Sequence, residues 1–373
     1  MMRVLHVYSG NLYGGVERML VTLASHRELC AGVEPGFALS FEGRLSRELA
    51  ETGAALHMLG KVRASRPATL RRARREFAKL LRSARYDVVI CHSVWAQAIF
   101  GPEARRYGAP LVFWLHDAAG GRHWLERWAR LTPPALAICN SRFTAGTLPS
   151  LYPRARAEVI HCPVPVAEPR ADRASARDEM KVDLKTAVII QASRLERWKG
   201  HSVLIDALAR LKERTDWVCW QVGGPQRKAE AVYLESLKDR AARLGIADRV
   251  RFLGQREDVP RLLAAADIHC QPNTGPEPFG IAFIEALAAG LPVVTTAIGG
   301  AAEIVDDQSG RLVQPDDAGG LKSVLGELLE DASLRKRLGS NGPARARAIS
   351  DPASQLARLA RLLDGVARDE AAA

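Results

Sequence analysis

Two glutamates that stand eight positions apart, Glu277 and Glu285, flank a Pro-Phe-Gly turn at residues 278–280. The apolar run after the turn predicts a helix, so that Glu277 lies just before it and Glu285 about a turn and a half inside it. Gly280 to Glu285 covers about 7 Å along a helix axis, and the unpaired N–H groups of a helix start suit a phosphate. Carboxylates accept hydrogen bonds from hydroxyl groups. The spacing therefore predicts a site for a phosphate with sugars on both sides, although an unrelated loop glutamate and helix glutamate would give the same spacing.

A second group of side chains suits the same ligand. Arg194 and Lys199 stand five positions apart in the loop that follows a strand-like run at residues 187–192. Both precede a predicted helix, so they can converge on one anion, the arginine as a planar fork and the lysine as a point charge. An exposed basic loop without a ligand would have the same composition. The pairing is typical of a diphosphate site.

In this order, the two motifs resemble those of the retaining glycosyltransferases of family 4, which have the GT-B fold. The resemblance implies that Arg194 and Lys199 bind the diphosphate of a sugar nucleotide. It also implies that Glu277 contacts hydroxyl groups of the donor sugar and that Glu285 binds the ribose. The resemblance is dense over residues 187–313 and looser before them.

The same resemblance points to further residues. It implies that Gly14 and Gly15 lie beside the donor phosphates and the acceptor, and that His116 contacts the donor sugar near the reacting centre. From the residues alone, the glycine pair suits a tight turn equally well, and His116 suits a hydrogen-bonded loop. The loop at the end of strand 251–254 is expected to hold the nucleobase through backbone groups. The candidate catalytic residues are His116, Glu277, Arg194 and Lys199. The candidate donor-binding residues are Gly14, Gly15, Arg194, Lys199, Phe252, Leu253, Phe279, Gly280, Ile281 and Glu285.

These residues need a scaffold of alternating strands and helices. Such an alternation is predicted by apolar runs at residues 3–9, 37–41, 55–59, 87–91 and 110–116 and by helical patterns at residues 16–29, 67–85 and 94–107. It predicts parallel sheets covered on both faces, with functional groups at the carboxyl ends of strands. His92 and His116 both stand at such ends, and Ser141 is expected to cap a helix.

The predicted fold class is α/β, a GT-B fold with two Rossmann-like domains that face each other across a cleft. We expect an N-terminal acceptor-binding domain, a linker, a C-terminal nucleotide-sugar-binding domain and a last helix that crosses back to the first domain. The ranges are 1–165, 166–186, 187–349 and 350–373, respectively.

The composition is that of a soluble globular protein, with 373 residues of which 47% are hydrophobic and 25% charged. Apolar runs fall short of the roughly 20 residues that span a bilayer, and the first strand turns polar at Ser9, too early for a signal peptide. Six scattered cysteines predict buried thiols in a reducing cytoplasm. Since no Asp-x-Asp motif stands at a suitable position, we expect no metal and no cofactor.

The net charge of +11 is concentrated, with nine of its units in residues 61–85. A helix at residues 67–85 would place its apolar residues on one face and most arginines elsewhere. Such a helix could simply be solvated, or it could attract anionic lipid at about 1 kcal/mol per basic residue. The resemblance favours lipid, because family members often act on lipid-linked acceptors. Nucleic acid is not expected, because no aromatic residues for base stacking stand among the basic ones.

The resemblance thus implies a retaining glycosyltransferase that uses a UDP-, GDP- or ADP-linked sugar and a sugar or lipid-linked acceptor. The expected role is polysaccharide, glycolipid or cell-envelope glycan synthesis, in the cytoplasm or on the inner face of the plasma membrane. A sugar-nucleotide epimerase or hydrolase of the same fold is an alternative, and a non-catalytic basic membrane adaptor is another. The donor sugar, the base, the acceptor and the oligomeric state stay open.

Overall fold

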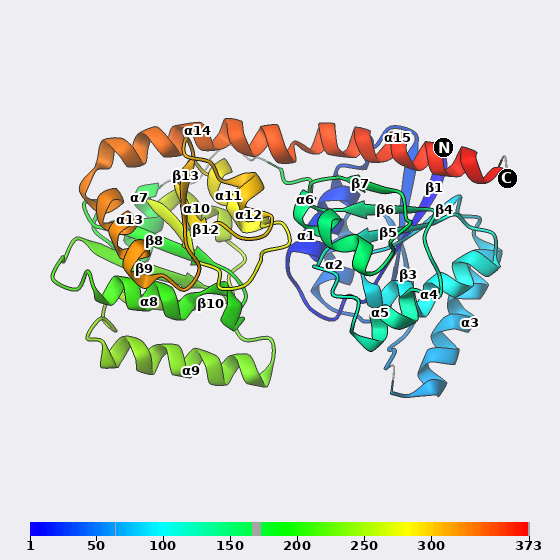
Figure 1. The fold of residues 1–373 in the computed structure, drawn as a ribbon, viewed down its shortest axis with the longest axis horizontal. Helices are drawn as coiled ribbons and strands as arrows, with labels where there is room; N and C mark the ends of the chain where they lie inside the picture. Colours follow the sequence, from blue (N-terminus) through cyan, green and yellow to red (C-terminus); the bar gives the residue numbers. More distant parts are fainter. Residues whose placement is uncertain (64, 166–172, 372–373) are drawn as a thin grey trace. The chain divides into compact units, whose positions relative to one another are not determined.

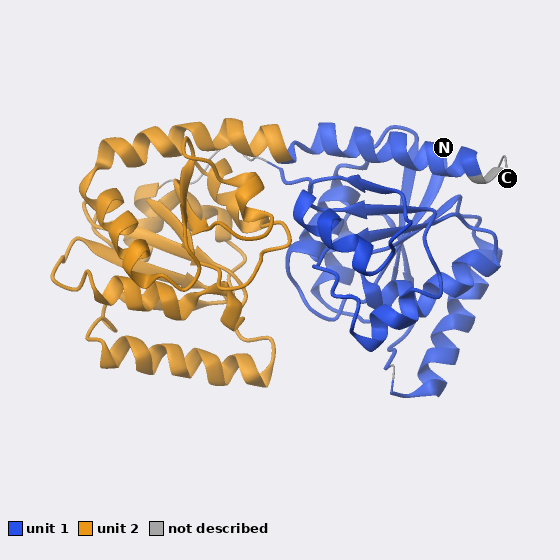
Figure 2. Ribbon diagram, in the orientation of Figure 1, with its two compact units in different colours: residues 1–165, 350–373 blue, residues 166–349 orange. Residues whose placement is uncertain are grey.

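The structure is a computed structural model that describes residues 1–63, 65–165 and 173–371. The chain forms two compact units, coloured separately in Figure 2: residues 1–165 with 350–373, and residues 166–349. Each unit is built on one parallel sheet (Figure 1). Three predicted segments extend beyond the described residues: the basic segment at residue 64, the linker at 166–172 and the last helix at 372–373.

Unit 1 contains a seven-stranded sheet in the order β3-β2-β1-β4-β5-β6-β7. Its strands are β1 (Met2–Tyr8), β2 (Val33–Leu39), β3 (Ala55–Met58), β4 (Val88–Cys91), β5 (Leu111–Leu115), β6 (Leu136–Cys139) and β7 (Ala157–Val159). Its α-helices are α1 (Gly15–Ser25), α2 (Arg44–Glu51), α3 (Pro67–Ser83), α4 (Val94–Arg106), α5 (Trp124–Ala129), α6 (Arg142–Thr147) and α15 (Pro352–Ala371), and its 3-10 helices are η1 (Arg27–Leu29) and η2 (Leu148–Ser150). All residues of β4, β5 and β6 are buried, as expected of parallel strands with helices on both faces.

Unit 2 contains a six-stranded sheet in the order β10-β9-β8-β11-β12-β13. Its strands are β8 (Ala187–Ala192), β9 (Trp217–Val222), β10 (Val250–Gly254), β11 (Ile268–Gln271), β12 (Val293–Thr296) and β13 (Gly310–Val313). Its helices are α7 (Arg173–Glu179), η3 (Arg197–Lys199), α8 (His201–Ala209), α9 (Lys228–Arg243), α10 (Val259–Ala265), α11 (Ile281–Ala288), α12 (Ala301–Ile304), α13 (Ala318–Glu330) and α14 (Ala332–Ser350).

Each sheet has one point where the strand order reverses, as in a Rossmann fold. This point lies between β1 and β4 in unit 1 and between β8 and β11 in unit 2. Ligands of such sheets bind at the carboxyl ends of the strands beside this point. Gly14 and His92 follow β1 and β4, while Arg194 and Asn273 follow β8 and β11. The predicted α/β class with two Rossmann-like halves is confirmed.

Residues 173–186 are part of unit 2, although the sequence predicted a linker over residues 166–186. Arg177 in α7 is only 1% exposed; its guanidinium donates to the Ala265 carbonyl at 2.9 Å and forms an ion pair with Asp267. Arg173 pairs with the same carboxylate at 2.5 Å. The polar composition of this segment was misleading, because carbonyls and a carboxylate, rather than water, satisfy its buried arginine.

Several element boundaries also differ from the prediction. The apolar run at residues 16–29 was predicted as one helix, but α1 ends at Ser25 and residues 27–29 form η1. The helices α2, α5, α13 and α14 were not predicted. The first two are short, and α14 contains Pro343, which reads in a sequence as a helix breaker. Ser141 caps α6 as predicted, accepting a hydrogen bond from Thr144 N at 3.0 Å.

The last helix, α15, packs on unit 1. Its buried residues recur at helical spacing and form one apolar face: Leu356, Leu359, Leu363 and Val366. The Cys30 thiol donates to the Leu356 carbonyl at 3.5 Å, and Arg358 pairs with Glu158 at 3.1 Å. Residues 350–371 therefore complete unit 1, although they are far from it in sequence.

All six cysteines are buried free thiols, as predicted. Burial raises the pKa of Cys30 to about 11 and that of Cys139 to about 12. A thiol with so high a pKa is protonated at neutral pH, so these cysteines act as small apolar side chains.

Candidate active site

The loop after β8 carries Arg194 and is packed tightly against the end of β11. Its last residue, Gly200, has a φ of 75°, and a Cβ there would lie 1.8 Å from the Pro272 carbonyl oxygen. The Trp198 carbonyl accepts a hydrogen bond from Thr274 N at 2.8 Å. These contacts bring the Arg194–Lys199 motif to the segment that carries Glu277.

Lys199 and Glu277 form an ion pair at the centre of this site. The Lys199 ammonium lies 2.5 Å from Glu277 Oε2, and the two side chains are 11% and 10% exposed. The ammonium also lies 4.0 Å from the ring centroid of Trp198, at cation–π distance. A cation that suits a diphosphate therefore lies against a carboxylate that suits sugar hydroxyls. The sequence predicted both residues but not their contact.

Two amides complete the environment of the carboxylate. Gln271 Nε2 and Asn273 Nδ2 each lie 3.1 Å from Glu277 Oε2, the oxygen that Lys199 also contacts. Both amides are buried, and they sit at the end of β11. Sequence reasoning missed them; the available signal was their position, polar residues at the carboxyl end of an otherwise apolar strand.

The backbone of Glu277 is held by a glycine turn after β12. The Glu277 carbonyl accepts from Gly300 N at 2.7 Å, and a Cβ on Gly299 would lie 2.3 Å from the same carbonyl oxygen. The sequence identified these glycines only as a turn. Their lack of side chains allows the close approach that fixes Glu277.

The helix α11 begins next to this turn. Gly280 is its N-cap with a φ of 113°, a left-handed conformation that other residues rarely adopt. Ile281 begins the helix and Glu285 is its fifth residue, as the sequence predicted. Glu285 is half-buried. Phe279, also predicted as a donor-binding residue, is buried, with an exposed fraction of 2%.

The other predicted donor-binding residues of unit 2 lie on neighbouring loops. Arg194 is 40% exposed and pairs with Glu196 at 3.1 Å. The register of β10 against β9 shifts between Phe252 and Gly254, so Leu253 has no partner in the ladder with β9. This bulge suits a backbone contact to a ligand, because it takes one residue out of the sheet.

Gly223 contacts both the loop that carries Arg194 and the end of β10 at Gly254. A Cβ on Gly223, at the end of β9, would lie 2.0 Å from the Ser193 carbonyl oxygen, and Gly223 N donates to the Gly254 carbonyl at 2.9 Å. The structure therefore gathers Arg194, Lys199, residues 252–254 and residues 277–285 at one end of the unit 2 sheet.

In unit 1, Gly14 and Gly15 begin α1. The left-handed residue of this glycine-rich turn is Gly10, with a φ of 78°. Gly14 has a φ of −168°, an extended conformation open to any residue. The φ of Gly14 therefore does not by itself require a glycine at this position.

His116 lies directly after β5 and is 6% exposed. Its Nε2 lies 3.1 Å from Nδ1 of His92, the other histidine predicted at a strand end. His6 in β1 extends this contact, with its Nδ1 2.8 Å from His92 Nε2. Burial lowers the pKa of His116 to about 3, so the ring is neutral at physiological pH. Sequence reasoning missed His6, because a histidine inside an apolar strand gives no distinct signal.

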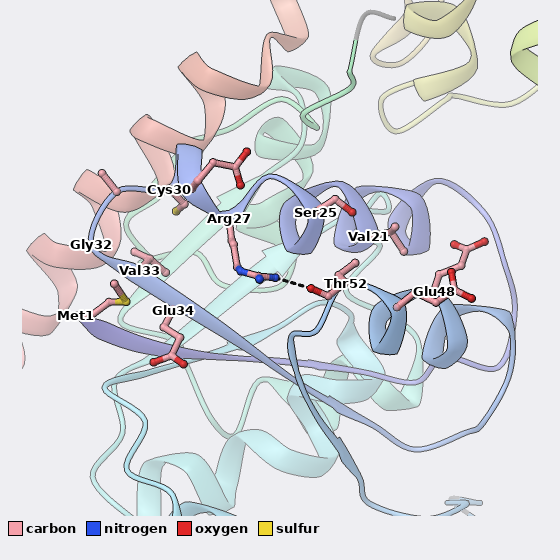
Figure 3. A pocket seen from close by; sticks show the side chains of 13 residues that line it. Met1, Val21, Ser25, Arg27, Cys30, Gly32, Val33, Glu34, Glu48 and Thr52 are labelled. Carbon is pink, nitrogen blue, oxygen red and sulfur yellow. Dashed lines mark hydrogen bonds between the residues drawn. The ribbon is translucent and has the colours of Figure 1, made fainter.

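A separate open cavity of about 1050 Å³ lies in unit 1 beside η1, the start of β2 and the end of α2 (Figure 3). Arg27 crosses it and donates to the Thr52 carbonyl at 2.7 Å. Four carboxylates also line it, those of Glu28, Glu34, Glu48 and Glu51. None of the predicted site residues lines this cavity.

Within the described part of the chain, neither a membrane-spanning helix nor a metal-binding cluster is present. No helix within it is long and apolar enough to cross a membrane. No group of three or more histidine, cysteine, aspartate or glutamate residues within it is arranged to hold a metal ion.

Two family models match the chain, one on each side of residue 170. The model described as Glycosyltransferase Family 4 matches residues 13–168, and the model described as Glycosyl transferases group 1 matches residues 172–345. Together they cover the site residues of both units. Both models are described as glycosyltransferases, in agreement with the predicted class of protein.

Relatives with known names agree with this class. The chain is 33% identical over 300 residues to D-inositol 3-phosphate glycosyltransferase of Salinispora tropica, an alignment of 71% of this chain and 61% of that protein. It is 31% identical over 297 residues to the enzyme of the same name from Nocardioides sp., with 71% and 64% covered. The chain therefore spans less than two thirds of the length of these relatives.

A solved structure matches over nearly the full length. HepE of Anabaena, crystallised with UDP and glucose, superposes with a TM-score of 0.84 at 26% identity, covering 98% of this chain and 100% of that one. Crystals of the same protein with UDP-glucose give the same values. The chain thus has the GT-B fold with two Rossmann-like halves, the first matching the Glycosyltransferase Family 4 model and the second the Glycosyl transferases group 1 model.

Proposed function

We propose that the protein is a retaining glycosyltransferase that moves a sugar from a UDP-linked donor to a hydroxyl group of a sugar or lipid-linked acceptor. The observation that carries the proposal is the Lys199–Glu277 pair at the switch point of unit 2, next to the start of α11. It places a cation and a hydroxyl-binding carboxylate side by side, as a sugar diphosphate requires. Among the three candidate nucleoside diphosphates, UDP is favoured because HepE was crystallised with UDP and UDP-glucose.

In this proposal the protein stabilises the negative charge that develops on the leaving diphosphate. Arg194, Lys199 and the first N–H groups of α11 stabilise the negative charge as the glycosidic bond breaks. Glu277, held by Lys199 and two amides, positions the sugar while its ring gains positive charge. Glu285 binds the ribose, and no resident metal or cofactor takes part.

Further contacts come from the other predicted residues. The backbone at Phe252 and Leu253 binds the base, Gly14 and Gly15 leave room for phosphate and acceptor, and His116 contacts the donor sugar. The names of the curated relatives support an acceptor with several hydroxyl groups, because inositol 3-phosphate is such a molecule. The expected products belong to polysaccharide, glycolipid or cell-envelope glycan synthesis.

We also propose that unit 1 associates with anionic lipid through the basic segment, residues 61–85, in a cytoplasmic protein that works at the inner face of the plasma membrane. Arg74 has a structural role, since it donates to the Ile99 carbonyl at 2.8 Å and lies over the Trp128 ring. Every other basic residue of the segment is exposed: Lys61, Arg63, Arg66, Arg71, Arg72, Arg75, Lys79, Arg82 and Arg85. The Lys199–Glu277 pair with its two amides argues against a protein that is only a membrane adaptor without catalytic activity.

The test is incubation of the protein with UDP-, GDP- and ADP-linked sugars, with and without candidate acceptors. The proposal expects release of UDP that depends on the acceptor, and a product whose anomeric proton coupling in NMR matches the configuration of the donor. Nucleotide release that is independent of any acceptor would indicate a hydrolase. A new epimer of the sugar would indicate an epimerase, and either result overturns the transfer proposal.

A further inference from the structure

Three histidines of unit 1 form one continuous hydrogen-bonded row, which we call the histidine row. His6 lies in β1, His92 directly after β4 and His116 directly after β5, and these strands are neighbours in the sheet. The two links, His6 Nδ1 to His92 Nε2 and His92 Nδ1 to His116 Nε2, measure 2.8 and 3.1 Å. Neighbouring rings lie nearly parallel, at 23° and 14°.

The histidine row is enclosed by aromatic side chains. Phe37 stacks on His6 with ring centroids 5.2 Å apart, and Trp114 stacks on His92 and His116 at 5.3 and 5.6 Å. Burial lowers the pKa of His6 and of His116 to about 3, and burial together with its two neighbours holds the pKa of His92 well below its usual value. Each ring is therefore neutral at physiological pH and carries a single proton.

Because each neutral ring has one N–H, the two hydrogen bonds constrain each other. His92 uses both nitrogens in the row but can donate only once. If His92 donates to His116, it must accept from His6, and all three rings are protonated at Nδ1. If it donates to His6, it must accept from His116, and all three are protonated at Nε2. A mixed arrangement sets two N–H groups or two bare nitrogens against each other, which leaves buried polar groups unsatisfied.

We propose that His6 and His92 are positioning residues that make His116 share their tautomer, and so decide whether His116 Nδ1 offers a proton or a lone pair to the donor sugar. His116 Nδ1 is buried and has no hydrogen-bond partner among the residues that the structure describes, so it is the end of the row that is left for a ligand. The role toward the sugar rests on the proposed function. A sugar hydroxyl can donate or accept, and a fixed tautomer orients it before the reaction begins.

The tautomers can be measured without any activity. In protein labelled with [15N]histidine and kept without nucleotide, long-range 1H–15N couplings assign the protonated nitrogen of each ring. The proposal expects one shared tautomer for His6, His92 and His116. A stable mixture of different tautomers along the row would overturn it, whether or not the protein proves to be a glycosyltransferase.

A substitution of His6 tests whether the far end of the histidine row influences the tautomer of His116. His6→Phe removes the first hydrogen bond with an aromatic ring of similar size, and no direct contact joins His6 to His116 among the described residues. The ring-nitrogen signals of His116 are expected to move toward the average of both tautomers. Unchanged His116 signals in the folded variant would refute the proposal.

Kinetics supply the second readout. His6→Phe is expected to lower kcat roughly two- to tenfold, the size of one hydrogen bond, with the KM for the donor nearly unchanged. His6→Asn keeps a polar group near the Nδ1 position and should recover most of the loss. The matched control is His57→Phe, which removes the 2.8 Å contact of His57 with the Tyr86 hydroxyl, outside the row. Equal losses in the two phenylalanine variants would indicate a general packing effect and count against the proposal.

Discussion

The Lys199 ammonium lies 2.5 Å from Glu277 Oε2, although the sequence assigned these two residues to different parts of the donor. The pair spans two loops that leave neighbouring strands, β8 and β11, and two amides donate to the same carboxylate oxygen. Glu277 is therefore oriented before a donor binds. A diphosphate that reaches Lys199 would share its charge with Glu277, which couples the binding of the phosphate to the orientation of the sugar.

Breaking one side of this pair should destabilise the protein more than removing both sides. Lys199→Met or Glu277→Gln leaves one partner nearly buried and unpaired, which is expected to cost about 3 kcal/mol. The double variant should lose less than the sum of the two, because no charge is left without a partner. Calorimetric unfolding of the four proteins measures this coupling.

The control for this cycle is the half-buried pair Arg256–Asp258, with an N–O distance of 2.7 Å and side chains 30% and 31% exposed. Arg256→Met is expected to cost less than about 1 kcal/mol, since water screens the remaining charge. Strictly additive losses at Lys199 and Glu277 would contradict the idea that the two residues act as a unit.

Arg194→Ala should weaken UDP binding roughly ten- to a hundredfold, because a charged hydrogen bond to phosphate contributes about 1.5–3 kcal/mol. Its matched control is Arg197→Ala, an exposed neighbour whose guanidinium lies over the Tyr233 ring at 4.7 Å. Titration calorimetry with UDP measures the affinity of each variant, which should fall in Arg194→Ala and stay near that of the wild type in Arg197→Ala. Equal affinities for UDP in the wild type and in Arg194→Ala would remove Arg194 from the diphosphate site.

The two glutamates should differ in their effect on turnover. Glu285 lies inside α11, and in the proposed site it binds the ribose, which does not change during the reaction. Glu285→Gln should therefore raise the KM for the donor and leave kcat nearly intact. In the same proposed site Glu277 contacts the sugar that gains positive charge, so Glu277→Gln should lower kcat. The reverse pattern in steady-state kinetics would mean that the nucleotide runs the other way along α11.

The basic segment predicts salt-sensitive lipid binding. Arg71, Arg75 and Lys79 are exposed and stand four residues apart along α3, so replacing all three by glutamate reverses the charge of one helix face. In vesicle sedimentation, the wild type should bind anionic but not neutral vesicles and be released by salt, because exposed charges are screened beyond about 8 Å at physiological ionic strength. The triple variant should not bind.

Its control carries the same three charge reversals in unit 2, on exposed residues of α9: Lys228, Lys238 and Arg243. This variant should bind like the wild type. Equal binding of the wild type to neutral and anionic vesicles, or no binding to either, would leave α3 as a solvated helix.

His269 should make the protein less stable in acid. It is 0% exposed in β11, its two ring nitrogens have no hydrogen-bond partner in the described part of the chain, and burial lowers its pKa to about 3. Between pH 6.5 and 3 the unfolded chain takes up a proton at His269 that the folded chain does not. The contribution of neutral His269 to the free energy of unfolding is therefore fully present above pH 6.5 and decreases as the pH falls below it. For this one residue, the free energy of unfolding decreases by at most about 1.4 kcal/mol for each unit by which the pH falls.

The measurement is the unfolding temperature between pH 7 and 5. His269→Phe should flatten the decline, because phenylalanine takes up no proton. The decline should remain steep in the control His123→Phe, since His123 is exposed. An identical pH dependence in the wild type and in His269→Phe would show that His269 is already charged or hydrated in the folded protein.

The sequence by itself was sufficient for the strands, most of the helices that connect them, and the loops that carry the site. Alternating apolar runs specify parallel strands locally, and glycine and polar residues mark where each strand ends. Arg194, Lys199, Glu277 and Glu285 could be identified because each motif is contiguous, with its spacing written in the chain. Ser141 as a helix cap is equally local, since it needs only the next three residues.

Only the tertiary structure decided which distant residues meet. The contact of Lys199 with Glu277 joins positions 78 residues apart, and that of His6 with His92 joins positions 86 apart. Neither follows from composition or periodicity, because the order of strands in the sheet sets both. The burial of Arg177 was also hidden in the sequence. Its partners are three carbonyls of residues 183–186 together with the distant Ala265 carbonyl and Asp267 carboxylate. A polar side chain looks the same in a sequence whether water or protein satisfies it.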